Sequence, residues 1–184
     1  MDKYHLRRRM VAAREALAPD VRKEKSSAII SHILNDERFQ MARTVMLYRS
    51  VRGEVQLDAL PALSSGKRYV YPLCVSRTQM VALWPETASE RAWKKGAFGI
   101  PEPNPAYCRE IDPAEIDFVV CPCTSFDRDH NRLGMGAGYY DRFLARCVHA
   151  DVVAAAFAVQ EAEAVPTEEF DYRMCAVITE NGAL

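Results

Sequence analysis

The sequence lacks an excess of charge of either sign. Its 24 basic and 25 acidic residues leave a formal net charge of −1, which argues against a protein that coats nucleic acid. It also lacks a long hydrophobic run, since the longest candidate, 151–159, has about half of the ~18 residues that a membrane span needs. The charged first ten residues have no apolar segment behind them and do not resemble a secretory signal. We therefore expect a soluble, cytoplasmic protein with neither nucleic acid nor membrane among its partners.

The six cysteines lack the spacing of a metal site. No two of them form a CxxC motif, and the four histidines are spread along the chain, so the sequence offers no zinc site. Cys121 and Cys123 stand one residue apart, which on a strand is poor geometry for a disulfide. We expect reduced and mostly buried thiols, as is usual in the cytosol.

The elements that are present predict one α/β domain spanning residues 1–184. Apolar spacing indicates two helices in the first 35 residues, the second opening at Pro19, and later helices at 55–63 and about 139–147. Short apolar runs predict strands at 44–48, 68–73, 79–84, 116–120, 152–159 and 175–179, while 93–113, rich in Gly and Pro, reads as a structured loop. Strands that alternate with helices favour a layered sandwich with a largely parallel central sheet flanked by helices.

The most informative segment runs from Arg132 to Asp141, between a predicted strand and a predicted helix. Gly134, Gly136 and Gly138 alternate in it. A backbone without side chains can approach a ligand closely, and its N–H groups beside a helix dipole form an anion site, with Arg132 placed to pair with a phosphate. The spacing matches neither the dinucleotide GxGxxG motif nor a Walker loop, so taken alone it also fits a purely structural turn.

The residues after the glycines each have two interpretations. Asp141 at a helix start is favoured by the macrodipole, but a carboxylate behind a phosphate loop can also hold Mg²⁺. Tyr139 and Tyr140 could pack in the core or stack on a flat ligand. His130, in the polar turn before the loop, could be a catalyst or a solvated surface residue.

The segment 116–144, IDFVVCPCTSFDRDHNRLGMGAGYYDRFL, resembles the signature of the 5-formyltetrahydrofolate cyclo-ligase family. The resemblance covers nearly the whole chain, because further matches occur in the family's order at Lys3, Leu6, Arg7, Arg14, Glu54, 98–103, Gln160, 165–166, Asp171 and 178–180. The chain departs from the pattern at His130, where the family often has glycine, at Cys123 and Thr124, and at Ala137. Ala137 keeps a small side chain, so a phosphate could still approach the loop.

The resemblance implies an ATP-dependent enzyme that cyclises 5-formyltetrahydrofolate, with or without a polyglutamate tail, to 5,10-methenyltetrahydrofolate. ADP and phosphate are released after the formyl oxygen has been phosphorylated. By resemblance, Lys3, Arg132 and Asp141 are catalytic, and Mg²⁺ binds Asp141 and Asp171. The folate would contact Arg49, Glu54, Phe98 and Tyr139. ATP would contact Lys3, Arg7, Arg132, Leu133, Gly134, Met135, Gly136, Ala137, Gly138, Tyr139 and Tyr140.

Other interpretations remain open at this point. Lys3 and Arg7 could form a solvated basic face, Glu54 a surface helix cap, and Phe98 part of the core. The whole protein could be another phosphate-binding α/β enzyme, such as a sugar-phosphate isomerase that uses no ATP, or a non-catalytic folate- or nucleotide-binding protein. The last would be expected to have lost Lys3, Arg132 or Asp141, and all three are present. We expect a monomer.

Overall fold

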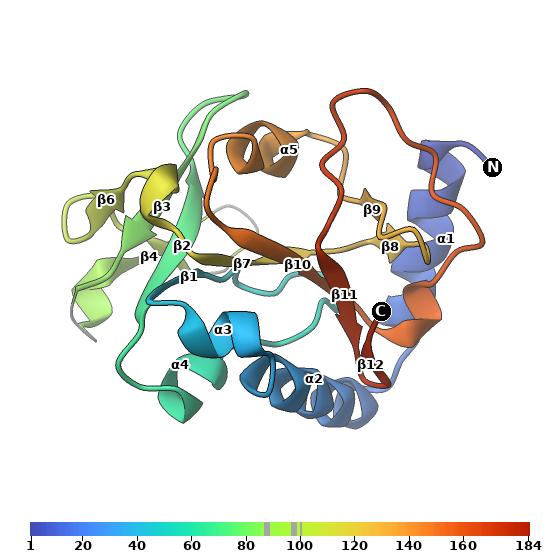
Figure 1. Ribbon diagram of the computed structural model, residues 1–184, viewed down its shortest axis with the longest axis horizontal. Coiled ribbons are helices and arrows are strands. Elements are labelled where there is room, and N and C mark those ends of the chain that lie inside the picture. The colour runs from blue at the N-terminus through green and yellow to red at the C-terminus, as the bar shows by residue number, and fades with distance from the viewer. Residues whose placement is uncertain (87–88, 97–98, 100) are drawn as a thin grey trace.

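A computed structural model describes residues 1–86, 89–96, 99 and 101–184, and within them an eight-stranded sheet forms the centre (Figure 1). Its strand order is β12 (Gly182–Ala183), β11 (Ala176–Thr179), β10 (Asp151–Ala155), β7 (Phe118–Pro122), β1 (Thr44–Met46), β2 (Arg68–Cys74), β3 (Met80–Trp84) and β6 (Arg109–Ile111). The run from β11 to β2 is parallel, whereas β12, β3 and β6 pair antiparallel with their neighbours. The prediction of a largely parallel α/β sheet is confirmed.

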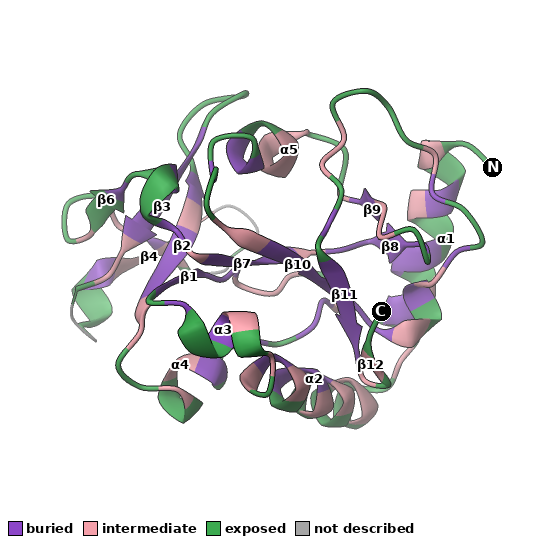
Figure 2. Ribbon diagram, viewed as in Figure 1, coloured by how far each residue is buried: buried purple, intermediate pink, exposed green. Residues whose placement is uncertain are grey.

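Helices cover both faces of the sheet because successive strand residues point to opposite sides. Val45 belongs to the core cluster under α2 (Pro19–Leu34), α3 (Glu37–Met41) and α4 (Leu60–Leu63). Its neighbour Met46 belongs to the cluster on the other face, under α5 (Tyr139–Leu144). The central strands β1, β7 and β10 are buried except at one end residue each of β7 and β10 (Figure 2), which explains their near-continuous apolar sequences.

The first helix, α1 (Lys3–Glu15), lies outside this sandwich and packs on a separate hairpin (Figure 1). Asp2 caps it, accepting a hydrogen bond from the backbone N–H of His5 at 2.8 Å. Leu6 and Met10 form a small apolar cluster with Leu133 of the hairpin strand β9 and with two residues beyond it. The hairpin consists of β8 (Ser125–Phe126) and β9 (Arg132–Leu133), and η4 (Ala158–Gln160) also contacts α1.

Several predicted boundaries are wrong. The helix expected at 55–63 is only α4, because Val55 and Leu57 lie in a segment without regular structure and their side chains enter the core. The expected loop 93–113 contains the short strands β4 (Trp93–Lys95), β5 (Pro101–Pro103) and β6. Helix α5 ends at Leu144, where i→i−3 turns replace it, and β10 ends at Ala155 rather than at residue 159. Unpredicted short helices in the described residues are α3, η1 (Glu90–Ala92), η3 (Pro113–Glu115) and η4.

The cysteines carry no disulfide in the structure. All six thiols are free, and Cys121, Cys123 and Cys147 are buried. Burial raises the pKa of each of these three thiols to about 12, so they are unreactive at neutral pH. In the part of the chain that the structure describes, no helix combines the length and apolarity needed to cross a membrane.

Candidate active site

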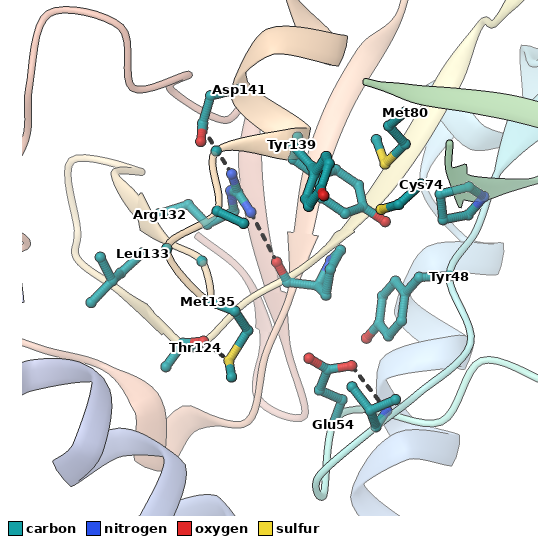
Figure 3. Close-up of a pocket in the computed structure, with 18 of the residues that line it drawn as sticks. Tyr48, Glu54, Cys74, Met80, Thr124, Arg132, Leu133, Met135, Tyr139 and Asp141 are labelled. Atoms are coloured by element: carbon teal, nitrogen blue, oxygen red, sulfur yellow. Dashed lines mark hydrogen bonds and ion pairs between the residues drawn. The ribbon is translucent and has the colours of Figure 1, made fainter. Parts of the chain in front are cut away.

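A cavity of about 590 Å³ opens beyond the carboxyl ends of β1, β2 and β7 (Figure 3). β2 lies beside β1 on one edge of that strand, and β7, which comes later in the chain, lies beside it on the other. Such a reversal leaves a crevice at the strand ends, where open α/β sheets bind their ligands. The cavity lining includes all the predicted site residues that the structure describes; Phe98 lies outside the described residues.

The glycine loop between β9 and α5 forms one wall of the cavity. Gly136 and Gly138 have φ angles of 100° and 65°, a region that disfavours other residues. A Cβ on Gly136 would also lie 3.2 Å from Cζ of Arg7, and one on Gly138 would lie 2.8 Å from the guanidinium of Arg142. Arg7 donates from Nε to the Gly134 carbonyl oxygen at 2.7 Å, so α1 fixes the loop conformation.

Arg132 is buried at the base of this loop, with 3% of its side chain exposed. Nη2 donates to Oδ1 of Asp141 at 2.9 Å, and Nη1 donates to the carbonyl oxygen of Pro122 at 3.2 Å. Nε is buried and finds no acceptor among the described residues. A buried cation with an unused donor beside a cavity is suited to an anionic ligand. Asp141 lies in the first turn of α5, where the macrodipole favours it, but the ion pair with Arg132 had not been predicted.

Lys3 pairs with the C-terminal segment across the mouth of the cavity. Its Nζ lies 2.6 Å from Oδ2 of Asp171 and 3.2 Å from a carboxylate oxygen of Glu168. Desolvation opposes the charge of Lys3, but the bonds to Asp171 and Glu168 outweigh it and raise the pKa of the ammonium group. The backbone N–H of Tyr172 reaches Oδ1 of Asp141 at 3.4 Å, which brings the same segment to α5. Lys3 and Arg7 are therefore not a solvated basic face.

Glu54 lies on the opposite side of the cavity and is 6% exposed, so it is not a surface helix cap (Figure 3). Its Oε2 accepts from the backbone N–H of Val51 at 3.0 Å, and its Oε1 lies 3.5 Å from Nη2 of Arg14. Burial is the main influence on the carboxyl and raises its pKa, with the charge of Arg14 acting against it. A buried carboxylate that faces a cavity can select a ligand with matching N–H donors.

The remaining described folate-side candidates, Arg49 and Tyr139, line the same cavity. Arg49 pairs with Asp58, and its guanidinium lies 4.3 Å from the ring centre of Trp93 and 5.3 Å from that of Tyr71. Tyr139 donates to the backbone oxygen of Ser76 at 2.9 Å, which ties the β2–β3 turn to the glycine loop. The aromatic and apolar surfaces in this half of the cavity suit a flat heterocycle.

Tyr48, Glu168 and Arg14 belong to the cavity or its support, and the sequence predicts no role for any of them. Tyr48 follows β1, is buried, and donates to the carbonyl oxygen of Val55; nothing distinguishes it in the sequence from an ordinary core aromatic. Glu168 stands three residues before Asp171, and this spacing is a weak indication in the sequence of two carboxylates that act together. Arg14 was matched to the family without a role, and its contact with Glu54 depends entirely on tertiary packing.

The carboxylates of Asp141 and Asp171 fit Mg²⁺ by their chemistry. This cation takes oxygen ligands and usually binds one or two carboxylates together with phosphate oxygens and water. Among the described residues, no group of three or more His, Cys, Asp or Glu side chains is arranged to hold a metal ion. Two carboxylates beside the glycine loop match a cation that phosphate oxygens also hold.

An α/β sheet with a glycine loop, a buried guanidinium and a buried carboxylate around one cavity is typical of an enzyme that binds a small anionic ligand. Residues 1–180 match the model of the 5-formyltetrahydrofolate cyclo-ligase family. The Escherichia coli K12 protein named 5-formyltetrahydrofolate cyclo-ligase is 30% identical over 175 residues, covering 90% of this chain and 93% of that one. The mouse protein of that name is 27% identical, covering 97% and 94%.

A solved structure agrees with these sequence relatives. The NMR structure of Aquifex aeolicus 5,10-methenyltetrahydrofolate synthetase matches with a TM-score of 0.86 and 30% identity, over 100% of this chain and 92% of that one. The chain belongs to the 5-formyltetrahydrofolate cyclo-ligase family. Its function is accordingly that of a ligase in folate one-carbon metabolism, with ATP as co-substrate, and the isomerase and non-catalytic alternatives are set aside.

Proposed function

We propose that the cavity binds ATP along the glycine loop and 5-formyltetrahydrofolate along the Glu54 side, and that the two react where these halves meet. The observation that carries the proposal is that Lys3, Arg132 and Glu54 all line one cavity of about 590 Å³. Cations at one end suit a triphosphate, and a buried carboxylate among aromatic rings at the other suits a pterin.

The chemistry requires activation of a poor leaving group. The formyl oxygen attacks the γ-phosphorus, and the bond to the bridging oxygen breaks to release ADP. The nitrogen at position 10 then attacks the formyl carbon, the C–O bond breaks, and the phosphate leaves with the proton from that nitrogen. Since the protein forms no covalent bond in these reaction steps, its contribution is to position the reactants and neutralise charge.

The described contacts support specific roles at the phosphate end. Lys3 would exchange its bonds to Asp171 and Glu168 for bonds to phosphate oxygens. The Nε of Arg132, which has no acceptor among the described residues, would donate to a phosphate oxygen. The backbone N–H groups of residues 134–138 would bind phosphate, with Leu133, Met135, Ala137 and Tyr140 lining the ATP path. Arg7 donates to the Gly134 carbonyl oxygen, so its main role would be to hold the loop conformation, with any phosphate contact made beside that bond.

At the folate end, Glu54 would accept hydrogen bonds from the N–H donors of the pterin. Arg49 and Tyr139 would line the same pocket, and Phe98 remains part of the proposal on resemblance alone. Asp141 and Asp171 would hold Mg²⁺. When bound, the cation would supply charge neutralisation at the phosphate oxygens.

Three further properties belong to this proposal. Activity as a monomer stays an expectation from the sequence. α1 and the C-terminal segment meet at the cavity, which supports a single domain over 1–184. A cytoplasmic location agrees with the composition and free thiols. A polyglutamate tail on the folate stays part of the proposal on resemblance alone.

The test is the appearance of methenyl-folate absorbance with purified protein, 5-formyltetrahydrofolate and Mg-ATP, leaving out one component at a time. We expect product only when all are present, with ADP and phosphate formed in equal amounts. Undiminished product with a chelator present and no nucleotide would contradict the proposal. ATP hydrolysis without folate turnover would point to a different acceptor.

A further inference from the structure

Arg14 is a fully buried cation whose hydrogen-bonding capacity is only partly used. It lies late in α1 with none of its surface exposed. Nε donates to the carbonyl oxygen of Arg52 at 3.0 Å, and Nη1 donates to that of Cys123 at 3.0 Å. The guanidinium thus joins α1 to the loop before Glu54 and to the segment after β7.

The third nitrogen points to a role beyond this clamp. Nη2 is buried, makes no hydrogen bond among the described residues, and lies 3.5 Å from Oε1 of Glu54. The two hydrogen bonds to carbonyl oxygens are sufficient to link these segments, but they do not compensate the positive charge. Burying an uncompensated guanidinium costs free energy. The carboxylate of Glu54 is the anion that the structure offers it.

The surroundings of Glu54 make it depend on that cation. Burial raises the pKa of Glu54, and among the opposing influences the charge of Arg14 comes first. The other titratable or charged groups around it are the partly exposed Arg52, which also favours the ionised form, and the buried, ordinarily neutral Tyr48, Tyr140 and Cys123. Without Arg14, a buried carboxylate would face mostly neutral neighbours.

The position of Arg14 on its helix connects the two ends of the cavity. Lys3 and Arg7 occupy the first turns of α1 beside the glycine loop, and Arg14 follows Lys3 by 11 residues, or about 16 Å of helix. One rigid element therefore touches both the proposed phosphate end and the proposed pterin end. A shift of α1 would disturb both substrates together.

We propose that Arg14 is a positioning residue for folate, which holds the Glu54 carboxylate charged and oriented toward the pterin without itself touching the substrate. The inference rests on the role of Glu54 given under the proposed function. It extends that role by making folate recognition depend on a helix whose other end faces ATP.

The experiment compares Arg14→Met with the wild type between pH 7 and 9, measuring KM for folate, KM for ATP, and folate binding by calorimetry without ATP. Loss of the cation raises the pKa of Glu54 further, so its protonated fraction is largest at low pH. We expect KM for folate to rise at least ten-fold relative to wild type at pH 7 and this ratio to shrink as pH rises. KM for ATP should change less than three-fold. A ratio that is flat with pH, or equal losses for both substrates, would overturn the inference.

Matched variants separate this role from a general effect. Arg9→Met removes the same charge from an exposed position of α1 and should leave both KM values unchanged. Arg14→Lys keeps the charge and should keep the folate KM ratio nearly independent of pH. In a Glu54→Gln background, Arg14→Met should weaken folate binding no further, whereas losses that multiply would show that Arg14 acts elsewhere.

Two outcomes remain informative if the first variant is unstable. Should Arg14→Met fail to fold, recovery of folding in the double variant with Glu54→Gln would support the inference, because the unpaired charge is then gone. Failure of the double variant as well would overturn it in favour of a structural clamp. If Glu54→Gln alone leaves folate binding unchanged, the proposed role of Glu54 fails, independently of how Arg14 behaves.

Discussion

Lys3 and Asp171 are 168 positions apart in the sequence, yet Nζ of Lys3 lies 2.6 Å from Oδ2 of Asp171. The pair joins the first turn of α1 to the segment before β11 at the edge of the cavity. In the proposed reaction each partner has another ligand, because phosphate oxygens would compete for Lys3 and Mg²⁺ for Asp171. The ion pair would then hold the two groups in place until the nucleotide arrives.

We expect Lys3→Met to reduce turnover at least about 10²-fold while changing the free energy of unfolding by no more than about 1 kcal/mol. The side chains of Lys3 and Asp171 are 21% and 27% exposed, and ion pairs that water can reach contribute little to stability. A cation that neutralises transferring phosphate contributes several kcal/mol to the transition state. Steady-state kinetics and thermal melts without ligands would measure both; unchanged turnover would exclude Lys3 from the site.

Asp141→Asn tests the metal role, and the structure changes the expected result. From the sequence alone, the variant should fold nearly normally, since Asn keeps much of the capping ability of Asp. Because Asp141 pairs with the buried Arg132, we now expect a loss of about 1–3 kcal/mol of stability as well. Turnover should fall at least about 10²-fold and recover in part at high Mg²⁺.

Asp171→Asn is the companion to this test. If both carboxylates bind one cation, it should show the same partial rescue by Mg²⁺ with a smaller loss of stability, because its partner Lys3 is less buried than Arg132. Near-normal turnover of Asp141→Asn at low Mg²⁺ would contradict the metal assignment and leave Asp141 as the partner of Arg132.

Glu54→Gln should weaken folate use by the loss of one charged hydrogen bond, about 1.5–3 kcal/mol or roughly 10–150-fold in affinity. Removing a buried carboxylate beside Arg14 also leaves that cation uncompensated, so a lower melting temperature is expected. The binding constants of the two substrates, measured separately, decide the role. An equal loss for ATP and folate would show that Glu54 is structural.

His130→Gly should leave turnover unchanged and stabilise the fold by up to about 1 kcal/mol. His130 has a φ of 63°, which costs a residue with a side chain about 1–2 kcal/mol, and the greater chain entropy of glycine offsets part of the gain. The departure from the family's usual glycine is thus a conformational cost in a turn. A large loss of turnover with unchanged stability would instead indicate a catalytic histidine.

Asp127 should contribute to stability in a way that depends on pH. Its burial alone would raise the carboxyl pKa, but hydrogen bonds from the Asn131 side chain and from backbone N–H groups, including that of Val165 at 2.8 Å, keep the pKa below 3.8. A lowered pKa stabilises the fold above about pH 4 and loses that effect as pH falls further. The difference in unfolding free energy between wild type and Asp127→Asn, by denaturant titration, should therefore be largest near neutrality and shrink below pH 4. A constant difference would contradict the assignment.

The features that the sequence determined are the local ones. Apolar spacing and Pro19 identified α1 and α2, and short apolar runs identified the parallel strands, because burial of one or both faces leaves a periodic pattern. The glycines of the loop between β9 and α5 predicted a special backbone conformation, and two of them adopt φ angles that other residues avoid. The family resemblance then supplied the reaction and most of the candidate residues.

Only the tertiary structure decided which charges meet. The pairs Lys3–Asp171 and Arg14–Glu54 depend on where α1 packs, and no local pattern encodes those distances. The pair Arg132–Asp141 depends on how the glycine loop turns between β9 and α5. Burial separates Arg14 from its exposed neighbour Arg9, although both are arginines on one helix. The type and spacing of a side chain determine which chemistry it can take part in. Its partner and its exposure to water depend on how the chain packs, and these two determine its protonation state and the free-energy cost of burying it.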